Sequence, residues 1–132
     1  MNSNMKTVLI ADDDEDILAL VDRALSESGY EVLLARDGAA ALATVRERSP
    51  ALALLDISMP ELDGYEVTSA LKGDPATKKT MVILFTARSE ASDVEKGYEA
   101  GADDYIMKPF TLKTLQSRVA AALGRATDVA QG

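Results

Sequence analysis

Short apolar runs alternate with longer segments of mixed polarity along the whole chain. The least interrupted run, Ala51 to Leu55, fits a parallel β-strand buried on both faces, although run length alone does not distinguish such a strand from a buried helix. Pro60 and the pair Asp63-Gly64 then break the chain in a turn. Comparable runs predict four further strands, at residues 7–11, 30–35, 81–85 and 105–108.

The segments between these runs have helical periodicity. Apolar residues recur at i, i+3, i+4, i+7 and i+8 in the first segment, and Gly29 closes the predicted amphipathic helix. This stripe consists of Ile17, Leu20, Val21, Ala24 and Leu25. Further helices are predicted at about residues 38–48, 64–72, 89–100 and 112–123, and the polar stretch 73–79 is the predicted surface loop.

Five strands alternating with five helices predict a single doubly wound (βα)5 domain of the α/β class. Such a domain has a parallel sheet with helices on both faces, and the common strand order for five strands is 2-1-3-4-5. The 132 residues fit one domain, which we place at residues 6–123. We expect residues 1–5 to be disordered and residues 124–132 to form a flexible tail or a truncated linker.

Composition removes several classes of function. The net charge of −8 disfavours nonspecific attraction to nucleic acid or anionic lipid, so we expect neither nucleic-acid nor membrane binding, although a local basic patch stays open. The chain has no cysteine for disulfides or zinc thiolates, and no histidine to serve as a metal ligand, general base or phosphohistidine. It shows no signal peptide and no membrane-length apolar run, so we expect a cytoplasmic location.

Three carboxylates are predicted to meet at one edge of this sheet. In the order 2-1-3-4-5 the first and third strands are neighbours about 4.8 Å apart, so Asp12, Asp13 and Asp56 come together at their ends. Each pair would repel by roughly 4 kcal/mol at 4 Å and an effective dielectric of about 20, so the cluster requires a cation or a shared proton. An all-oxygen cluster favours a hard divalent ion, and Mg²⁺ is the expected cofactor.

Two other strand ends add groups that bind phosphate. Thr86 ends the fourth predicted strand with a hydroxyl, and Lys108 ends the fifth with an ammonium group. A magnesium ion, an ammonium group and a hydroxyl around one carboxylate suit phosphoryl transfer to that carboxylate, because the transferring group carries its charge on its oxygens. Asp56 is the candidate nucleophile, since it ends the central strand and precedes a loop.

Four motifs in order give the chain a specific resemblance. They are Val8-Leu-Ile-Ala-Asp12-Asp13, Leu54-Leu-Asp56-Ile-Ser-Met-Pro60-Glu-Leu-Asp-Gly64, Phe85-Thr86-Ala87 and Ala100-Gly-Ala-Asp-Asp-Tyr105-Ile-Met-Lys108-Pro109-Phe110. From about Lys6 to Leu123 the chain resembles a response-regulator receiver domain of two-component signalling. The resemblance implies a phosphoacceptor switch that catalyses only its own phosphorylation and dephosphorylation, so we do not expect an enzyme that acts on other substrates.

The resemblance also implies a role for each residue of the motifs. Asp56 accepts phosphate from a histidine kinase or phosphotransfer protein, and phosphorylation shifts the surface formed by helix 89–100, strand 105–108 and the last helix. The implied magnesium ligands are Asp13, Asp56 and the Ser58 carbonyl, with Asp12 assisting through water. The implied phosphoryl-binding and switch residues are Thr86, Lys108 and Tyr105, with a cis Lys108–Pro109 peptide bond, and Ser58 and Arg88 occupy the positions that tune phosphoryl lifetime.

Other interpretations compete with this one. Asp14, Glu15 and Asp16 are better explained as a helix N-terminus than as metal ligands, and a calcium EF-hand fails because Ile17 stands where glycine is needed. A phosphohydrolase using an aspartyl phosphate is the main alternative, but Ser58 stands where its general acid belongs. A metal-independent interaction domain is the third. The output is left open: a downstream protein, a fused effector domain or a phosphorylation-dependent dimer.

Overall fold

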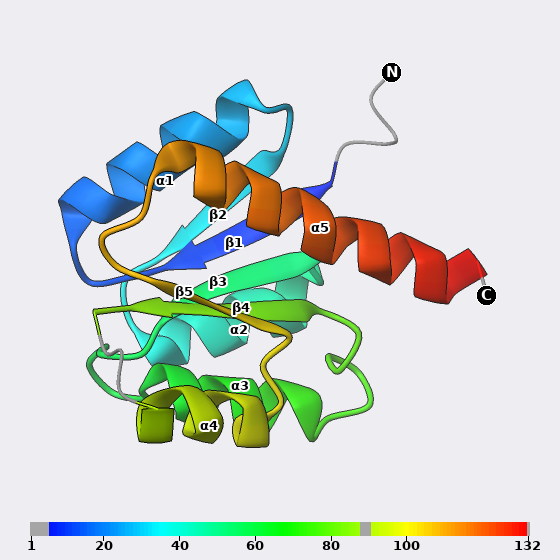
Figure 1. Ribbon diagram of the computed structural model, residues 1–132. Helices are drawn as coiled ribbons and strands as arrows, with labels where there is room; N and C mark the ends of the chain where they lie inside the picture. The colour runs from blue at the N-terminus through cyan, green and yellow to red at the C-terminus, as the bar shows by residue number, and fades with distance from the viewer. Residues whose placement is uncertain (1–5, 88–90, 132) are drawn as a thin grey trace.

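A parallel sheet of five strands forms the centre of the computed structural model, which describes residues 6–87 and 91–131 (Figure 1). Its spatial order is β2-β1-β3-β4-β5, as predicted, and every pair of neighbours is parallel. The strands are β1 (Thr7–Ala11), β2 (Glu31–Ala35), β3 (Leu52–Asp56), β4 (Met81–Thr86) and β5 (Asp104–Met107).

Five helices cover the two faces of this sheet, and Figure 1 shows α1 and α5 on one side and α2, α3 and α4 on the other. Their bounds are α1 (Glu15–Glu27), α2 (Gly38–Arg48), α3 (Gly64–Lys72), α4 (Ala91–Ala100) and α5 (Leu112–Gln131). The doubly wound α/β fold predicted from the alternation of runs is therefore confirmed.

The apolar run that ends at Asp56 supplies both cores. Leu52 and Leu54 belong to the cluster under α1 and α5, whereas Ala53 and Leu55 belong to the cluster under α2, α3 and α4. All four side chains are 0% exposed. Because successive side chains of a strand point to opposite faces, a strand covered on both sides is apolar at every position. Burial on both faces also fixes the strand end that carries Asp56.

Aspartate caps begin the three helices that follow β1, β2 and β3. Asp14 accepts from the backbone N–H groups of Asp16 and Ile17, and Asp37 accepts from that of Ala40. The third cap, of α3, is a capping box in which Asp63 and Glu66 each bind the other's backbone N–H. Caps of this kind satisfy N–H groups that lack helical partners, so they fix the residue at which each of these helices starts.

Several boundaries differ from the prediction. β2 begins at Glu31, where residue 30 was predicted. β5 spans Asp104–Met107, where residues 105–108 were predicted. It ends before Lys108 because Pro109 has no N–H with which to extend the ladder. The predicted start of α4 at residue 89 lies outside the described residues.

The last helix is longer than predicted. α5 continues to Gln131, so residues 124–131 are helical. The sequence predicts a tail or linker there, because apolar residues no longer recur at helical spacing. Periodicity marks only the packed part of a helix, and alanine, arginine and glutamine favour its continuation. No helix among the described residues is long and apolar enough to cross a membrane.

Candidate functional site: an acidic cluster at the strand ends

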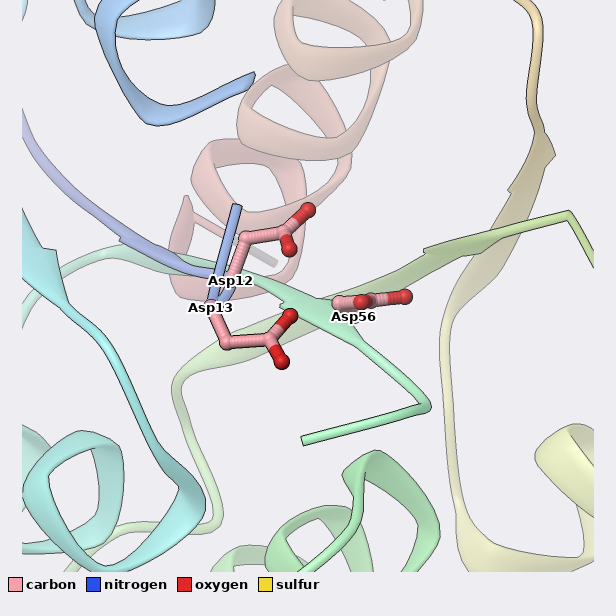
Figure 2. Close-up of side chains that lie close together, drawn as sticks. All are labelled: Asp12, Asp13 and Asp56. Atoms are coloured by element: carbon pink, nitrogen blue, oxygen red, sulfur yellow. The ribbon is translucent and has the colours of Figure 1, made fainter. Parts of the chain in front are cut away.

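Three carboxylates meet at the carboxyl edge of the sheet, as Figure 2 shows. Asp12 and Asp13 directly follow β1, and Asp56 is the last residue of β3, the neighbouring strand. One carboxylate oxygen from each lies within 4.8 Å of the others. Asp12 and Asp56 are buried, whereas Asp13 is exposed on the solvent side. The predicted convergence of these three residues is confirmed.

Asp56 is held in an environment that opposes its charge. Asp56 is 5% exposed, and in the sheet it pairs with Phe85 of β4. Burial raises the pKa of the Asp56 carboxyl most, and the nearby charge of Asp12 and a hydrogen bond with that residue also raise it, while Lys108 and a backbone hydrogen bond from Ser58 lower it. The net result is a pKa of about 6. At neutral pH Asp56 is therefore mainly ionised, but at a cost in free energy.

Lys108 supplies the positive charge of the site. Its Nζ lies 2.9 Å from Asp12 Oδ2 and 3.8 Å from Asp56 Oδ1, so the ammonium group is bound to Asp12 and stands next to Asp56. The same Nζ lies 5.0 Å from the centre of the Phe85 ring. The Lys108 backbone N–H donates to the Thr86 carbonyl at 2.8 Å, which ties the end of β5 to the end of β4. The predicted cis Lys108–Pro109 bond is present.

The consecutive acids after β1 divide between the site and helix α1. Asp12 Oδ1 accepts from the Asp14 backbone N–H at 3.0 Å, and Asp14 Oδ1 accepts from Asp16 N–H at 2.9 Å as the N-cap of the helix. Asp12 therefore faces the site with one oxygen toward Lys108 while its other oxygen orders the turn. Asp14 to Asp16 belong to the helix start, as the sequence indicates.

Thr86 and Tyr105 lie on the two strands beyond Asp56. Thr86 ends β4 and is 2% exposed, and Tyr105 in β5 is 7% exposed within the core under α4. Gly97 of α4 packs against this ring: a Cβ at Gly97 would lie 3.4 Å from Tyr105 Cδ2 and 2.9 Å from Leu84 Cδ1. The absence of a side chain at Gly97 lets the helix backbone lie directly on the aromatic ring.

Comparison with known proteins decides the family. The model of the response regulator receiver domain matches residues 8–120 of the chain. The chain belongs to the response-regulator receiver family.

Three relatives show the range of proteins that carry such a receiver. The transcriptional regulatory protein PrrA of Mycobacterium tuberculosis is 48% identical over 118 residues, which cover 89% of this chain and 50% of that protein. The chain thus spans about half the length of the curated relatives it matches. A CheY-like receiver domain protein from Methanospirillum hungatei superposes with a TM-score of 0.88 at 30% identity, covering 94% of this chain and 98% of its own. The receiver of a signal transduction histidine kinase from Syntrophus aciditrophicus gives 0.84 at 35%, covering 90% of each chain.

Two further predicted receiver positions, Ser58 and Arg88, come two residues after Asp56 and Thr86 in the sequence. Ser58 is exposed in the loop after β3, and its backbone hydrogen bond to Asp56 is the contact that the structure shows for it. Arg88 lies outside the described residues. The metal-binding role of the Ser58 carbonyl and the lifetime-tuning roles of both residues stay predictions.

Two glycines near the site have a role that sequence reasoning missed. A Cβ at Gly64 would lie 2.6 Å from the Asp56 carbonyl oxygen, so only glycine fits behind Asp56. A Cβ at Gly38 would lie 1.9 Å from the carbonyl oxygen of Leu62, in the loop between β3 and α3. The visible signal was the dipeptide Asp-Gly at both positions, which predicts a turn or helix start. A close backbone contact across the sheet edge has no local signature.

Proposed function

We propose that this receiver is a phosphoacceptor switch in which Asp56 receives a phosphoryl group from a phosphohistidine of another protein. The observation that carries the proposal is the placement of a lysine 3.8 Å from the Asp56 carboxylate, in a cluster with two further carboxylates at the end of a buried strand. These 132 residues contain no histidine, so a phosphohistidine donor has to belong to a separate kinase or phosphotransfer module.

The residues present fit a magnesium ion. All donors in the cluster are carboxylate oxygens, the oxygens lie within 4.8 Å of one another, and Asp13 keeps the cluster open to solvent. Asp13, Asp56 and the Ser58 carbonyl would hold the ion, with Asp12 assisting through water. When bound, Mg²⁺ supplies positive charge to the oxygens of the transferring phosphoryl group.

The chemistry is one displacement at phosphorus. An Asp56 carboxylate oxygen attacks, the new P–O bond forms as the P–N bond of the phosphohistidine breaks, and the departing imidazole keeps the electron pair and takes up a proton. The Lys108 ammonium, next to the nucleophile, stabilises charge on the phosphoryl oxygens, and the Thr86 hydroxyl donates to them. Ser58 and Arg88 then set the rate at which water removes the group.

The switch uses the residues that link this site to α4 and β5. Movement of Thr86 toward the phosphoryl group changes the space next to Tyr105, whose ring packs against the Gly97 backbone of α4. A changed rotamer of Tyr105 alters the surface of α4, β5 and α5. This surface already exposes apolar side chains, since Met107 is 50% and Tyr98 48% exposed.

The output of the switch is inferred from the relatives of the chain. The names of the relatives include transcriptional regulators, a CheY-like receiver and a histidine kinase. We propose a downstream protein or a fused effector domain as the recipient, with a phosphorylation-dependent dimer as one form of output. The cytoplasmic location expected from the sequence stays a prediction.

Intact mass spectrometry after incubation with acetyl phosphate and Mg²⁺ tests the phosphoacceptor directly. We expect one added phosphoryl group on the wild type, none after EDTA treatment and none on Asp56→Asn. Absence of the adduct on a folded wild type would refute the proposal. Multiple turnover of a small phosphate ester would instead favour the phosphohydrolase, which here lacks a general acid because its position is Ser58. A melting temperature that does not respond to Mg²⁺ would favour an interaction domain.

A further inference from the structure

We propose that Gly38, the first residue of α2, is a positioning residue for the loop that carries Ser58, and that this contact sets the affinity of the acidic cluster for magnesium. The loop, residues 57–63, joins β3 to α3 and follows Asp56 directly. The inference rests on the proposed function, because it assigns a magnesium ligand to the Ser58 carbonyl. It concerns a residue that touches neither the metal nor the phosphoryl group.

Gly38 contacts the loop chiefly through backbone atoms. The Gly38 N–H donates to the Pro60 carbonyl at 3.3 Å. A Cβ at Gly38 would lie 1.9 Å from the Leu62 carbonyl oxygen and 2.7 Å from both the Leu62 carbonyl carbon and its Cβ. These separations are far shorter than van der Waals contact, and a backbone carbonyl cannot turn away as a flexible side chain can. Any side chain at Gly38 therefore has to displace the loop or the helix.

The helix is the part less able to move. The Asp37 side chain caps α2 through the Ala40 N–H at 2.7 Å, and Ala41 and Val45 are 0% exposed in the core on that face of the sheet. Displacing α2 would open gaps beneath both core residues, and packed interiors resist such changes. A side chain at Gly38 would thus act mainly on the loop.

The loop is built to transmit such a displacement. Its own hydrogen bonds run from Met59 N–H to Ile57 O at 3.1 Å and from Leu62 N–H to Pro60 O at 3.0 Å. Glu61 adopts a φ of 73°, a region that a residue with a Cβ seldom enters. Because these bonds and this φ angle fix the loop conformation, a push at Leu62 moves the segment as a unit. The Ser58 carbonyl belongs to that segment.

The first test compares magnesium affinities by isothermal titration calorimetry. We expect Gly38→Ala to weaken Mg²⁺ binding by about 10–100-fold, the range found when groups that orient metal ligands are removed. Gly124→Ala is the matched control, because a Cβ there meets nothing within 4 Å. Val45→Ala is the control for stability, since it removes buried packing from the same helix about two turns after Gly38, and we expect its Mg²⁺ affinity to equal that of the wild type.

Each outcome bears on a different claim. A wild type that binds no Mg²⁺ overturns the proposed function, whereas equal affinity of wild type and folded Gly38→Ala overturns the role of Gly38. A loss of affinity in Val45→Ala that matches the loss in Gly38→Ala reduces Gly38 to a stability residue and also overturns the inference.

A second test needs no substitution and decides the case if Gly38→Ala does not fold. In ¹H–¹⁵N spectra of the wild type, we expect Mg²⁺ to shift the Gly38 amide and slow its hydrogen exchange, because the ion fixes the loop that accepts this N–H. The Ala40 amide, which bonds to Asp37 in the same turn, is the internal reference and should change little. A Gly38 amide that does not respond at saturating Mg²⁺ would overturn the proposal.

Discussion

Replacement of Asp56 by asparagine is predicted to stabilise the fold. The carboxyl is buried next to Asp12, and its pKa rises from 3.8 to about 6 in the folded chain. Below pH 3.8 both folded and unfolded chains hold the proton, so the group has no effect on stability. As the pH rises from 3.8 to about 6, the unfolded chain releases the proton first, and stability falls. Above pH 6 the full penalty remains.

The size of this penalty follows from the two pKa values. Each pKa unit corresponds to about 1.4 kcal/mol, so a carboxyl with a pKa of about 6 in place of 3.8 costs about 3 kcal/mol at neutral pH. Asparagine has the same shape and no charge, and Lys108 keeps its partner Asp12 at 2.9 Å. In a domain of this size about 3 kcal/mol corresponds to a rise of roughly 10 °C in melting temperature.

Chemical denaturation in EDTA at several pH values measures this effect. We expect Asp56→Asn to exceed the wild type by about 3 kcal/mol at pH 7.5 and to lose that advantage progressively as the pH falls from about 6 to 3.8. Asp13→Asn removes the same charge from an exposed position in the same cluster, so it should change stability much less. An advantage that is constant across this pH range, or equal in both variants, would refute the assignment of the penalty to the buried carboxylate.

Three other variants test separate contacts. Lys108→Met leaves two buried carboxylates without their ammonium partner, so we expect a loss of about 2–3 kcal/mol in EDTA and a larger Mg²⁺-induced rise in melting temperature than in the wild type. Tyr65→Phe removes the hydroxyl that donates to the Asp93 carbonyl at 3.0 Å, and should cost about 1 kcal/mol by urea denaturation, with faster hydrogen exchange in α4. Arg36→Ala breaks a 2.8 Å ion pair with Glu15, but both side chains are more than half exposed, so the same titration should show a change below about 0.5 kcal/mol. An unchanged free energy of unfolding in Lys108→Met or Tyr65→Phe, or a large loss in Arg36→Ala, would contradict these assignments.

The fold could be predicted because its signal repeats along the chain. Each apolar run ends in polar residues and is followed by a helical stripe, and few topologies accept that alternation. The strand order then brings Asp12 and Asp13 next to Asp56 without any knowledge of side-chain geometry. The structure confirms this convergence and the partition of Asp14 into the helix cap.

The contacts that could not be predicted cross between elements without leaving a local pattern. The sequence places Lys108 at a strand end, but only the folded sheet shows that its ammonium contacts Asp12 more closely than Asp56. Gly38 gives a turn signal whether or not a carbonyl from another loop lies against it. The end of α5 differs for another reason: apolar periodicity reports packing, and a helix continues on intrinsic propensity after packing ends.

The penalty on Asp56 also limits how much of the proposed switch the site can drive alone. Complete relief of about 3 kcal/mol would change a conformational equilibrium by roughly 150-fold, and only if the relief occurred in one of the two states. A change from 1:99 to 99:1 needs about 5.5 kcal/mol, or 10⁴-fold. The remainder has to come from contacts made only after phosphorylation, and Thr86 and Lys108 are the groups placed to make them. Phosphorylated variants lacking either group should therefore occupy the active state only partly, while variants on the exposed face of α1 should retain the full shift.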